Sequence, residues 1–252
     1  MELNRKRRGN SRYFIAFISL ALVLAFAFWG ARALGRRMEF FRIDTVSIQG
    51  RSILPEAFCQ SLSEEYIGRN LFDVSTSEVA ERYEQLARVK SCRVRRVPPS
   101  RLSISIEERR CALWVQSSDG RLLPIDAERV VLDADLTYAH EDAPVLRLPM
   151  AAHEVAPGDT LRNDTLEQAF ALHGAIAAHS EWLAARVSQY YRRGNELVLV
   201  EAGSGCRIVL GQGDMDDKLR RLVFFAENKG FSPGTTLDLR FRDQIVAKMG
   251  VR

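Results

Sequence analysis

The sequence is poor in the residues that build metal and cofactor sites. It holds four histidines and four cysteines among 252 residues, and no two cysteines have the CxxC spacing of a metal or redox site. His173 and His179 lie six positions apart on an expected helix, so they point to different faces and do not form an i,i+4 ligand pair. We therefore expect no metal site and no cofactor.

Catalytic arrangements are equally scarce. Ser204 lies in a Gly-Ser-Gly turn but lacks the flanking pattern of a nucleophile elbow. Gly211-Gln212-Gly213 resembles part of a phosphate loop, yet no Lys-Ser/Thr pair completes it. The acidic pairs Glu107-Glu108 and Asp216-Asp217 are neighbours in sequence, whereas carboxylates that share one substrate come from separate positions. These absences favour a binding protein over an enzyme.

The cysteines leave their own redox state open. All four lie beyond the first apolar stretch of the chain, where an oxidising compartment would permit a disulfide. Buried free cysteines that act as small apolar residues are an equal alternative. The residues concerned are Cys59, Cys92, Cys111 and Cys206.

Acidic residues are almost absent from the N-terminal segment. Residues 1–37 hold eight lysines and arginines against one acid, Glu2, out of totals of 36 and 32. The remaining 28 basic and 31 acidic residues make 38–252 slightly acidic. The basic character of the chain therefore belongs to its first segment, which argues against nucleic-acid binding as the main role.

An uncharged stretch of 19 residues runs from Tyr13 to Ala31. A helix of this length covers roughly the 30 Å hydrocarbon core of a membrane. Positive charge is denser in residues 1–12 than after the stretch, which favours a cytoplasmic tail. Ala31-Arg32-Ala33 also fits a signal-peptide cleavage site, but the stretch exceeds the usual core of about 7–15 residues. We predict a retained single-pass anchor over 13–31, a linker over 32–41 and an exported remainder.

Two folded domains are expected after the anchor, and the fold class is α+β. Residues 42–110 show a strand ending at Gly50, two helices and two further strands divided by Pro98-Pro99. The second helix is expected to begin at Ser75, with Glu78 as its capping-box partner. Residues 111–252 show short strands with flanking helices, one of them capped by Thr165 with Gln168, and predict a mainly antiparallel β domain. Its last strand is expected to run from Thr236 through Phe241 to about Ala247.

Several short motifs in the first domain resemble those of POTRA domains, the polypeptide-transport-associated modules. They are Val46-Ser47-Ile48-Gln49-Gly50, Gly68-Arg69-Asn70-Leu71-Phe72, Val94-Arg95-Arg96-Val97-Pro98, and Leu102–Ile106 followed by Glu107-Glu108-Arg109.

With one anchor ahead of it, this arrangement is similar to the bacterial cell-division family FtsQ (DivIB). The likeness continues through Leu210-Gly211 before the last helix and through Leu237-Asp238-Leu239-Arg240-Phe241 near the end. Two positions depart from the family pattern. Arg129 replaces a turn glycine after Ile125-Asp126-Ala127-Glu128, and Cys111 replaces a proline.

The resemblance implies a non-enzymatic divisome scaffold in the cytoplasmic membrane at the division septum. It would bind FtsB and FtsL outside that membrane and help recruit and regulate septal peptidoglycan synthesis. In the family, the terminal strand offers its edge to a strand of FtsB. Carried over, this makes Leu239, Arg240, Phe241 and Ile245 the expected partner-binding residues, with a core role as the alternative for Phe241.

A rival hypothesis is a POTRA-containing export or outer-membrane assembly factor. It would predict repeated POTRA modules and a tail of alternating segments of about 10 residues. Neither pattern is found in the sequence.

Overall fold

The computed structural model describes residues 14–26, 30, 39–134 and 141–249. They form two compact units, residues 1–84 with 91–107, and residues 85–90 with 108–252. The predicted anchor lies partly outside the described residues, and its described part is helical over 14–26. Among the described residues, no helix has both the length and the apolar character needed to cross a membrane.

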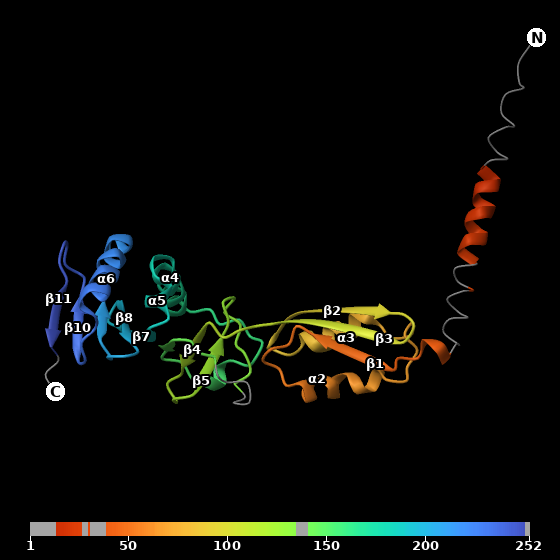
Figure 1. Ribbon diagram of the computed structural model, residues 1–252, viewed down its shortest axis with the longest axis horizontal. Helices are drawn as coiled ribbons and strands as arrows, with labels where there is room; N and C mark the ends of the chain where they lie inside the picture. Colours follow the sequence, from red (N-terminus) through yellow and green to blue (C-terminus); the bar gives the residue numbers. More distant parts are fainter. Residues whose placement is uncertain (1–13, 27–29, 31–38, 135–140, 250–252) are drawn as a thin grey trace, which may run out of the picture. The chain divides into compact units, whose positions relative to one another are not determined.

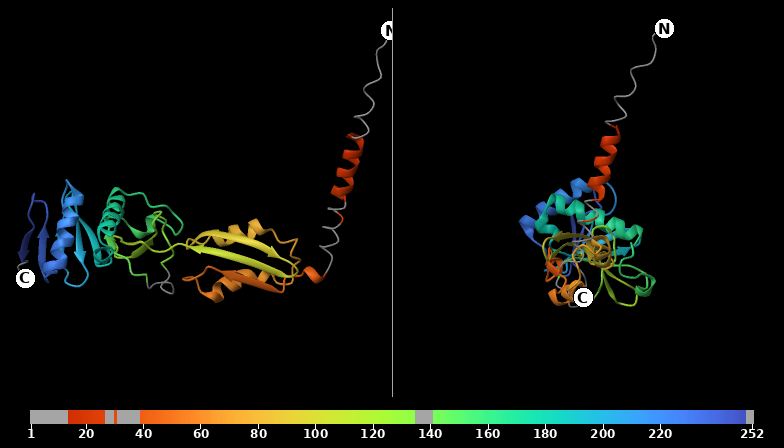
Figure 2. Two further views of the ribbon diagram at one scale, coloured as in Figure 1. Left: turned by 45° about the horizontal axis from the view of Figure 1, so that its top comes forward. Right: turned by 90° about the vertical axis from the view of Figure 1, so that its right-hand side faces the viewer.

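The first unit has the predicted strand–helix–helix–strand–strand order. Its sheet has the strand order β1-β3-β2, with β1 and β3 parallel, and the three strands run side by side in Figures 1 and 2. Helix α2 packs against β1, and the Tyr83 hydroxyl of α3 donates to the Cys59 carbonyl of α2 at 2.8 Å. The elements are η1 (Glu39–Phe41), β1 (Thr45–Gln49), α2 (Glu56–Ser63), η2 (Glu64–Tyr66), α3 (Thr76–Glu84), β2 (Val89–Val97) and β3 (Arg101–Glu108).

Alternation of side chains determines which face of this sheet is buried. Leu102, Ile104 and Ile106 of β3 are buried, while the residues between them are exposed or half-buried. Since successive strand residues point to opposite faces, the polar residues of β3 lie on the uncovered face. The capping prediction at the start of α3 is confirmed, because Ser75 Oγ accepts from the Glu78 N–H at 3.3 Å.

The second unit is built on one eight-stranded sheet of order β11-β10-β9-β8-β7-β6-β4-β5. Its strands are β4 (Leu113–Gln116), β5 (Leu122–Ile125), β6 (Val145–Arg147), β7 (Val187–Arg193), β8 (Glu196–Glu201), β9 (Arg207–Val209), β10 (Thr235–Asp238) and β11 (Val246–Met249). The helical elements are η4 (Ala152–Glu154), α4 (Asp164–His179), α5 (Glu181–Ala184) and α6 (Met215–Lys229).

This sheet is more mixed than the sequence predicts. The pairs β4–β6, β6–β7 and β9–β10 are parallel, and the other four neighbouring pairs are antiparallel. Parallel neighbours require a crossover, and here α4 with α5 joins β6 to β7 while α6 joins β9 to β10. The helices therefore set the strand directions, which strand periodicity alone does not reveal.

Two local features of this unit concern the start of helix α4 and the conformation of a turn at Arg129. The N-cap of α4 is Asn163, whose Oδ1 accepts from the N–H groups of Thr165 and Leu166 at 2.9 and 3.3 Å, so the predicted cap at Thr165 is two residues late. Arg129 adopts φ 67°, a conformation that glycine adopts without strain. Its guanidinium bonds Glu167 and lies 4.7 Å from the Phe170 ring centre, contacts that offset the strain.

All four cysteines are free thiols, with Cys59 and Cys206 buried. Burial raises the pKa of the Cys92 and Cys206 thiols to about 11. Thiolate is the reactive form, so burial disfavours reaction of these two thiols near neutral pH.

Candidate partner-binding edge

The large sheet ends in β11, the last described strand of the chain. Val246–Met249 pairs antiparallel with β10 on one side, and no strand of the described residues pairs with its other side. Its residues are mostly exposed, and Met249 is 90% exposed. One row of backbone N–H and C=O groups therefore faces away from the sheet, where another strand can add.

The prediction of one continuous terminal strand through Leu239 and Phe241 is wrong, because this stretch is divided between two strands. The chain turns after β10 and returns as β11, with Asp243 in the turn at φ 65°. Strand β10 consequently lies between β9 and β11 and is not an edge. Aspartate tolerates this left-handed conformation better than most residues, and Arg242-Asp243-Gln244 was the sequence signal for the turn.

Leu239 belongs to the core. It is fully buried, and its N–H donates to the Val209 carbonyl at 2.8 Å, which extends the β9–β10 pairing by one residue. Its side chain is part of the main hydrophobic cluster of this unit, against which Ile245 packs while partly buried. Of the four expected partner-binding residues, Leu239 is therefore unable to contact a partner directly.

Arg240 is held by groups of its own unit. It forms two hydrogen bonds to the Asp238 carboxylate, at 2.9 and 2.7 Å, and approaches Glu196 at 3.7 Å. Its stem crosses Gly211, where a Cβ would lie 2.6 Å from the arginine Cγ, so glycine is needed there. Arg240 thus fixes the connection between β10 and β11 and leaves about half of its side chain in solvent.

Charge around the edge is nearly balanced. Hydrogen bonds from Arg240 lower the pKa of the buried Asp238 carboxyl to about 2, and Lys248 of β11 approaches the same carboxylate at 3.7 Å. The Asp238 carboxylate in turn raises the pKa of Arg240. A cavity of about 340 Å³ lies over this face and is lined by Arg193, Glu196, Val209, Thr236, Asp238, Arg240, Lys248 and Met249.

Phe241 is the aromatic residue closest in sequence to the edge, and it is 43% exposed. Its backbone carbonyl accepts from Nη1 of Arg221 on α6 at 3.4 Å. This bond ties the backbone of Phe241, in the connection between β10 and β11, to α6, and the exposed side chain is not among the buried core residues. This position is compatible with the contact role that the sequence predicts for it.

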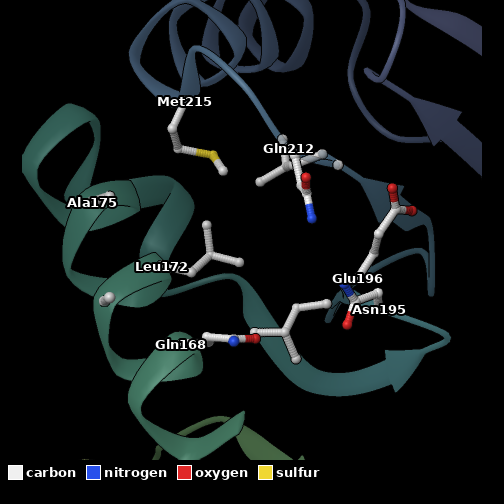
Figure 3. A pocket seen from close by; sticks show the side chains of 11 residues that line it. Gln168, Leu172, Ala175, Asn195, Glu196, Gln212 and Met215 are labelled. Carbon is white, nitrogen blue, oxygen red and sulfur yellow. The ribbon is translucent and has the colours of Figure 1, made fainter. Parts of the chain in front are cut away.

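A second hollow lies away from the edge, between α4 and the segment that joins β9 to α6. Figure 3 shows Leu172 and Met215 facing one another across it, with the amide groups of Gln168, Asn195 and Gln212 around its rim. Its volume is about 420 Å³, and Glu196 is its one acidic lining residue. Buried Lys218 donates to the carbonyls of Leu210 and Gln212, at 2.7 and 2.5 Å, and so holds this segment in place.

Across residues 14–26, 30, 39–134 and 141–249, no three His, Cys, Asp or Glu side chains are grouped to hold a metal ion. The arrangement at β11 is suited to main-chain recognition, in which backbone bonds supply affinity and alternate side chains supply selectivity. The sequence-based prediction centred the exposed edge on Leu239-Arg240-Phe241 and missed Val246–Met249 as the separate strand that forms the edge.

Comparisons with known proteins agree with this architecture. A family described as "POTRA domain, FtsQ-type" matches residues 41–109. Cell division protein FtsQ of Rhodothermus marinus is 28% identical over 224 residues, which cover 84% of this chain and 79% of the relative. FtsQ of Geotalea daltonii is 23% identical over 83% of this chain and 76% of its own length. FtsQ of Caulobacter vibrioides is 33% identical over 96 residues, or 38% of this chain and 32% of its own.

The order of elements in the first unit agrees with the match to the FtsQ-type POTRA family, and the chain is similar to cell-division proteins named FtsQ over most of its length.

Proposed function

We propose that this chain is a non-enzymatic divisome scaffold that binds FtsB and FtsL outside the cytoplasmic membrane. Through this binding it would help recruit and regulate septal peptidoglycan synthesis. The observation that carries the proposal is the free edge of β11 at the end of an eight-stranded sheet. We assign this edge, with Phe241 beside it, as the site that accepts a strand of FtsB.

The register of β11 supports this assignment. Ala247 pairs with the buried Leu237, so Ala247 lies on the α6 side of the sheet, whereas Lys248 pairs with Thr236. A strand added to β11 would therefore meet an apolar side and a charged side in alternation. Lys248 and the exposed part of Arg240 supply positive charge on the second side, which favours a partner strand with an acidic residue there.

The proposal includes a single transmembrane anchor over residues 13–31 and a cytoplasmic tail over 1–12. Its support is the 19-residue uncharged stretch, the helical conformation of 14–26 and the excess of basic residues ahead of it. The apolar side chains of 14–26 are exposed, which is the arrangement that a lipid-facing helix has.

Proline substitutions in β11 test the edge directly. Backbone N–H groups of neighbouring strand residues point to opposite sides, so of Ala247 and Lys248 one N–H faces β10 and the other faces the partner. A proline removes that N–H. We expect one of Ala247→Pro and Lys248→Pro to weaken binding of the FtsB–FtsL complex at least tenfold while the melting temperature stays within a few degrees, and the other to lower the melting temperature.

Two controls accompany the proline pair. Lys248→Ala keeps the N–H and isolates the side-chain charge, and Leu122→Pro places the same change on β5, the opposite edge of the sheet. Binding would be measured with the full chain in detergent. Leu122→Pro should bind the complex as the unmodified chain does. If both β11 proline variants also bind it normally, β11 is not the partner site.

A further inference from the structure

Exposed apolar side chains and arginines gather at one end of the first unit, which we call the POTRA tip. The tip consists of residues 39–45, 67–72 and 95–101. Backbone bonds join its three segments: Gly68 N–H to the Ile43 carbonyl at 2.8 Å, and Asp44 N–H to the Ser100 carbonyl at 3.0 Å. In Figures 1 and 2, η1 lies at the end of the unit where β2 turns into β3.

Each segment of the tip exposes one large apolar residue. Phe40 is 65% exposed, Ile67 53% and Val97 40%, and Val97 leads into the exposed Pro98-Pro99 turn. Elsewhere in the described part of this unit after residue 39, Phe58 is the other large apolar residue of this kind, at 37%. Phe41 stacks edge-on against Phe72 with ring centres 5.1 Å apart, so the segment that carries Phe40 is anchored to the unit.

Basic residues are concentrated at the tip, as the exposed apolar residues are. The tip contains five basic residues and two acidic ones, and one of these acids, Glu39, pairs with Arg42 at 3.3 Å. The rest of the unit from residue 46 to 84 and 91 to 107 contains three basic and eight acidic residues. The five tip residues are Arg42, Arg69, Arg95, Arg96 and Arg101.

The chain length ahead of the tip limits how far it lies from the apolar stretch. Only residues 32–38 separate Ala31 from Glu39, and eight extended steps span at most roughly 28 Å. If residues 13–31 cross the membrane, as the proposed function holds, Glu39 stays within roughly 28 Å of the outer end of the anchor, a range that includes the headgroups. Arginines near an anionic surface and apolar side chains at its boundary both favour contact.

We infer that the POTRA tip rests on the outer surface of the membrane, with its arginines on anionic lipid headgroups and Phe40, Ile67 and Val97 at the boundary with the acyl chains. This contact rests on the proposed anchor but does not depend on the partner site at β11.

Photo-crosslinking of the full chain in lipid nanodiscs tests this contact. A photoreactive benzoylphenylalanine replaces Val97 or, as the matched control, Phe58, which lies in the first turn of α2 and is separated from the tip by the rest of that helix. Discs contain phosphatidylcholine alone or with phosphatidylglycerol. We expect lipid adducts at position 97 that depend on phosphatidylglycerol and weaken with salt, and several-fold fewer at position 58.

Charge variants sharpen the test. Arg95→Gln with Arg101→Gln should lower the adduct yield at position 97 by about fivefold for each arginine removed while occupancy is low. Arg51→Gln with Arg82→Gln removes the same charge outside the tip and should leave that yield unchanged. Thermal melts of both double variants verify that the unit still folds.

The outcomes separate this inference from the proposed anchor. A chain that alkaline carbonate removes from membranes lacks the anchor, and both proposals fall. A chain that stays inserted but gives equal yields at positions 97 and 58, or yields indifferent to phosphatidylglycerol, overturns the tip contact alone. The tip contact is also overturned if position 97 in native membranes forms an adduct with a protein and not with lipid.

Discussion

Leu239 and Phe241 stand two positions apart between β10 and β11, yet they have opposite roles in the fold. Leu239 is 0% exposed and lies in the main core, whereas Phe241 is 43% exposed. Leu239→Ala should destabilise the second unit by about 2–5 kcal/mol, since it removes buried methyl groups and leaves a cavity. Phe241→Ala should weaken FtsB–FtsL binding by roughly thirtyfold, because an interface aromatic commonly contributes about 2 kcal/mol.

Thermal unfolding and partner binding would be measured on the same samples of both variants. The expected pattern is a lowered melting temperature for Leu239→Ala and a nearly unchanged one for Phe241→Ala. If Phe241→Ala loses binding only in step with a lowered melting temperature, its side chain supports the core and is not a contact residue.

Arg129 shows what a motif can and cannot predict about a single residue. The resemblance indicates a glycine position there, and the positive φ confirms that the backbone still has the shape that favours glycine. The compensating contacts with Glu167 and Phe170 come from a helix 38 and more residues away. Local sequence therefore predicts the turn, while the partners that make arginine tolerable depend on the packing of α4.

At the scale of secondary-structure elements, a pH-dependent contact joins helices α4 and α6. His179, at the end of α4, bonds Asp216 near the start of α6 at 2.8 Å and the Ala175 carbonyl at 2.9 Å. The backbone bond to Ala175 and the bond to Asp216 raise the pKa of His179 above its usual 6.5, against the opposing charge of Arg220. Arg220 itself pairs with Asp216 at 3.2 Å.

The raised pKa of His179 determines how its contribution to stability changes with pH. The folded state holds the proton more tightly than the unfolded state, so the contribution is complete below pH 6.5 and is lost as pH rises through the folded value. His173 acts in the opposite sense, because burial lowers its pKa. His179→Gln should therefore be less stable than the unmodified chain near pH 6, and the difference should shrink toward pH 8.

Denaturant unfolding at several pH values measures this difference. His153→Gln, which leaves the α4–α6 contact intact, is the control and should follow the unmodified chain throughout. A difference between His179→Gln and the unmodified chain that does not change with pH would show that the contact contributes through packing alone.

At the scale of the whole molecule, both cores lie after residue 38. The buried apolar residues from Ile43 to Leu239 are divided between the two units, while nine large exposed apolar residues crowd into 14–26. A fragment of residues 39–252 should therefore stay monomeric in solution and unfold cooperatively. Size-exclusion chromatography and a thermal melt check this, and an aggregated fragment without a cooperative transition would contradict it.

Local patterns in the sequence were sufficient to predict the element order of the first unit, the start of α3 at Ser75 and the exposed apolar stretch. Each depends on residues within one or two turns of each other. The hairpin of β10 and β11, the burial of Leu239 and the mixed strand directions were decided by tertiary structure. Strand pairing joins residues far apart in sequence, and an alternating pattern continues unchanged through a turn that only the packed sheet reveals.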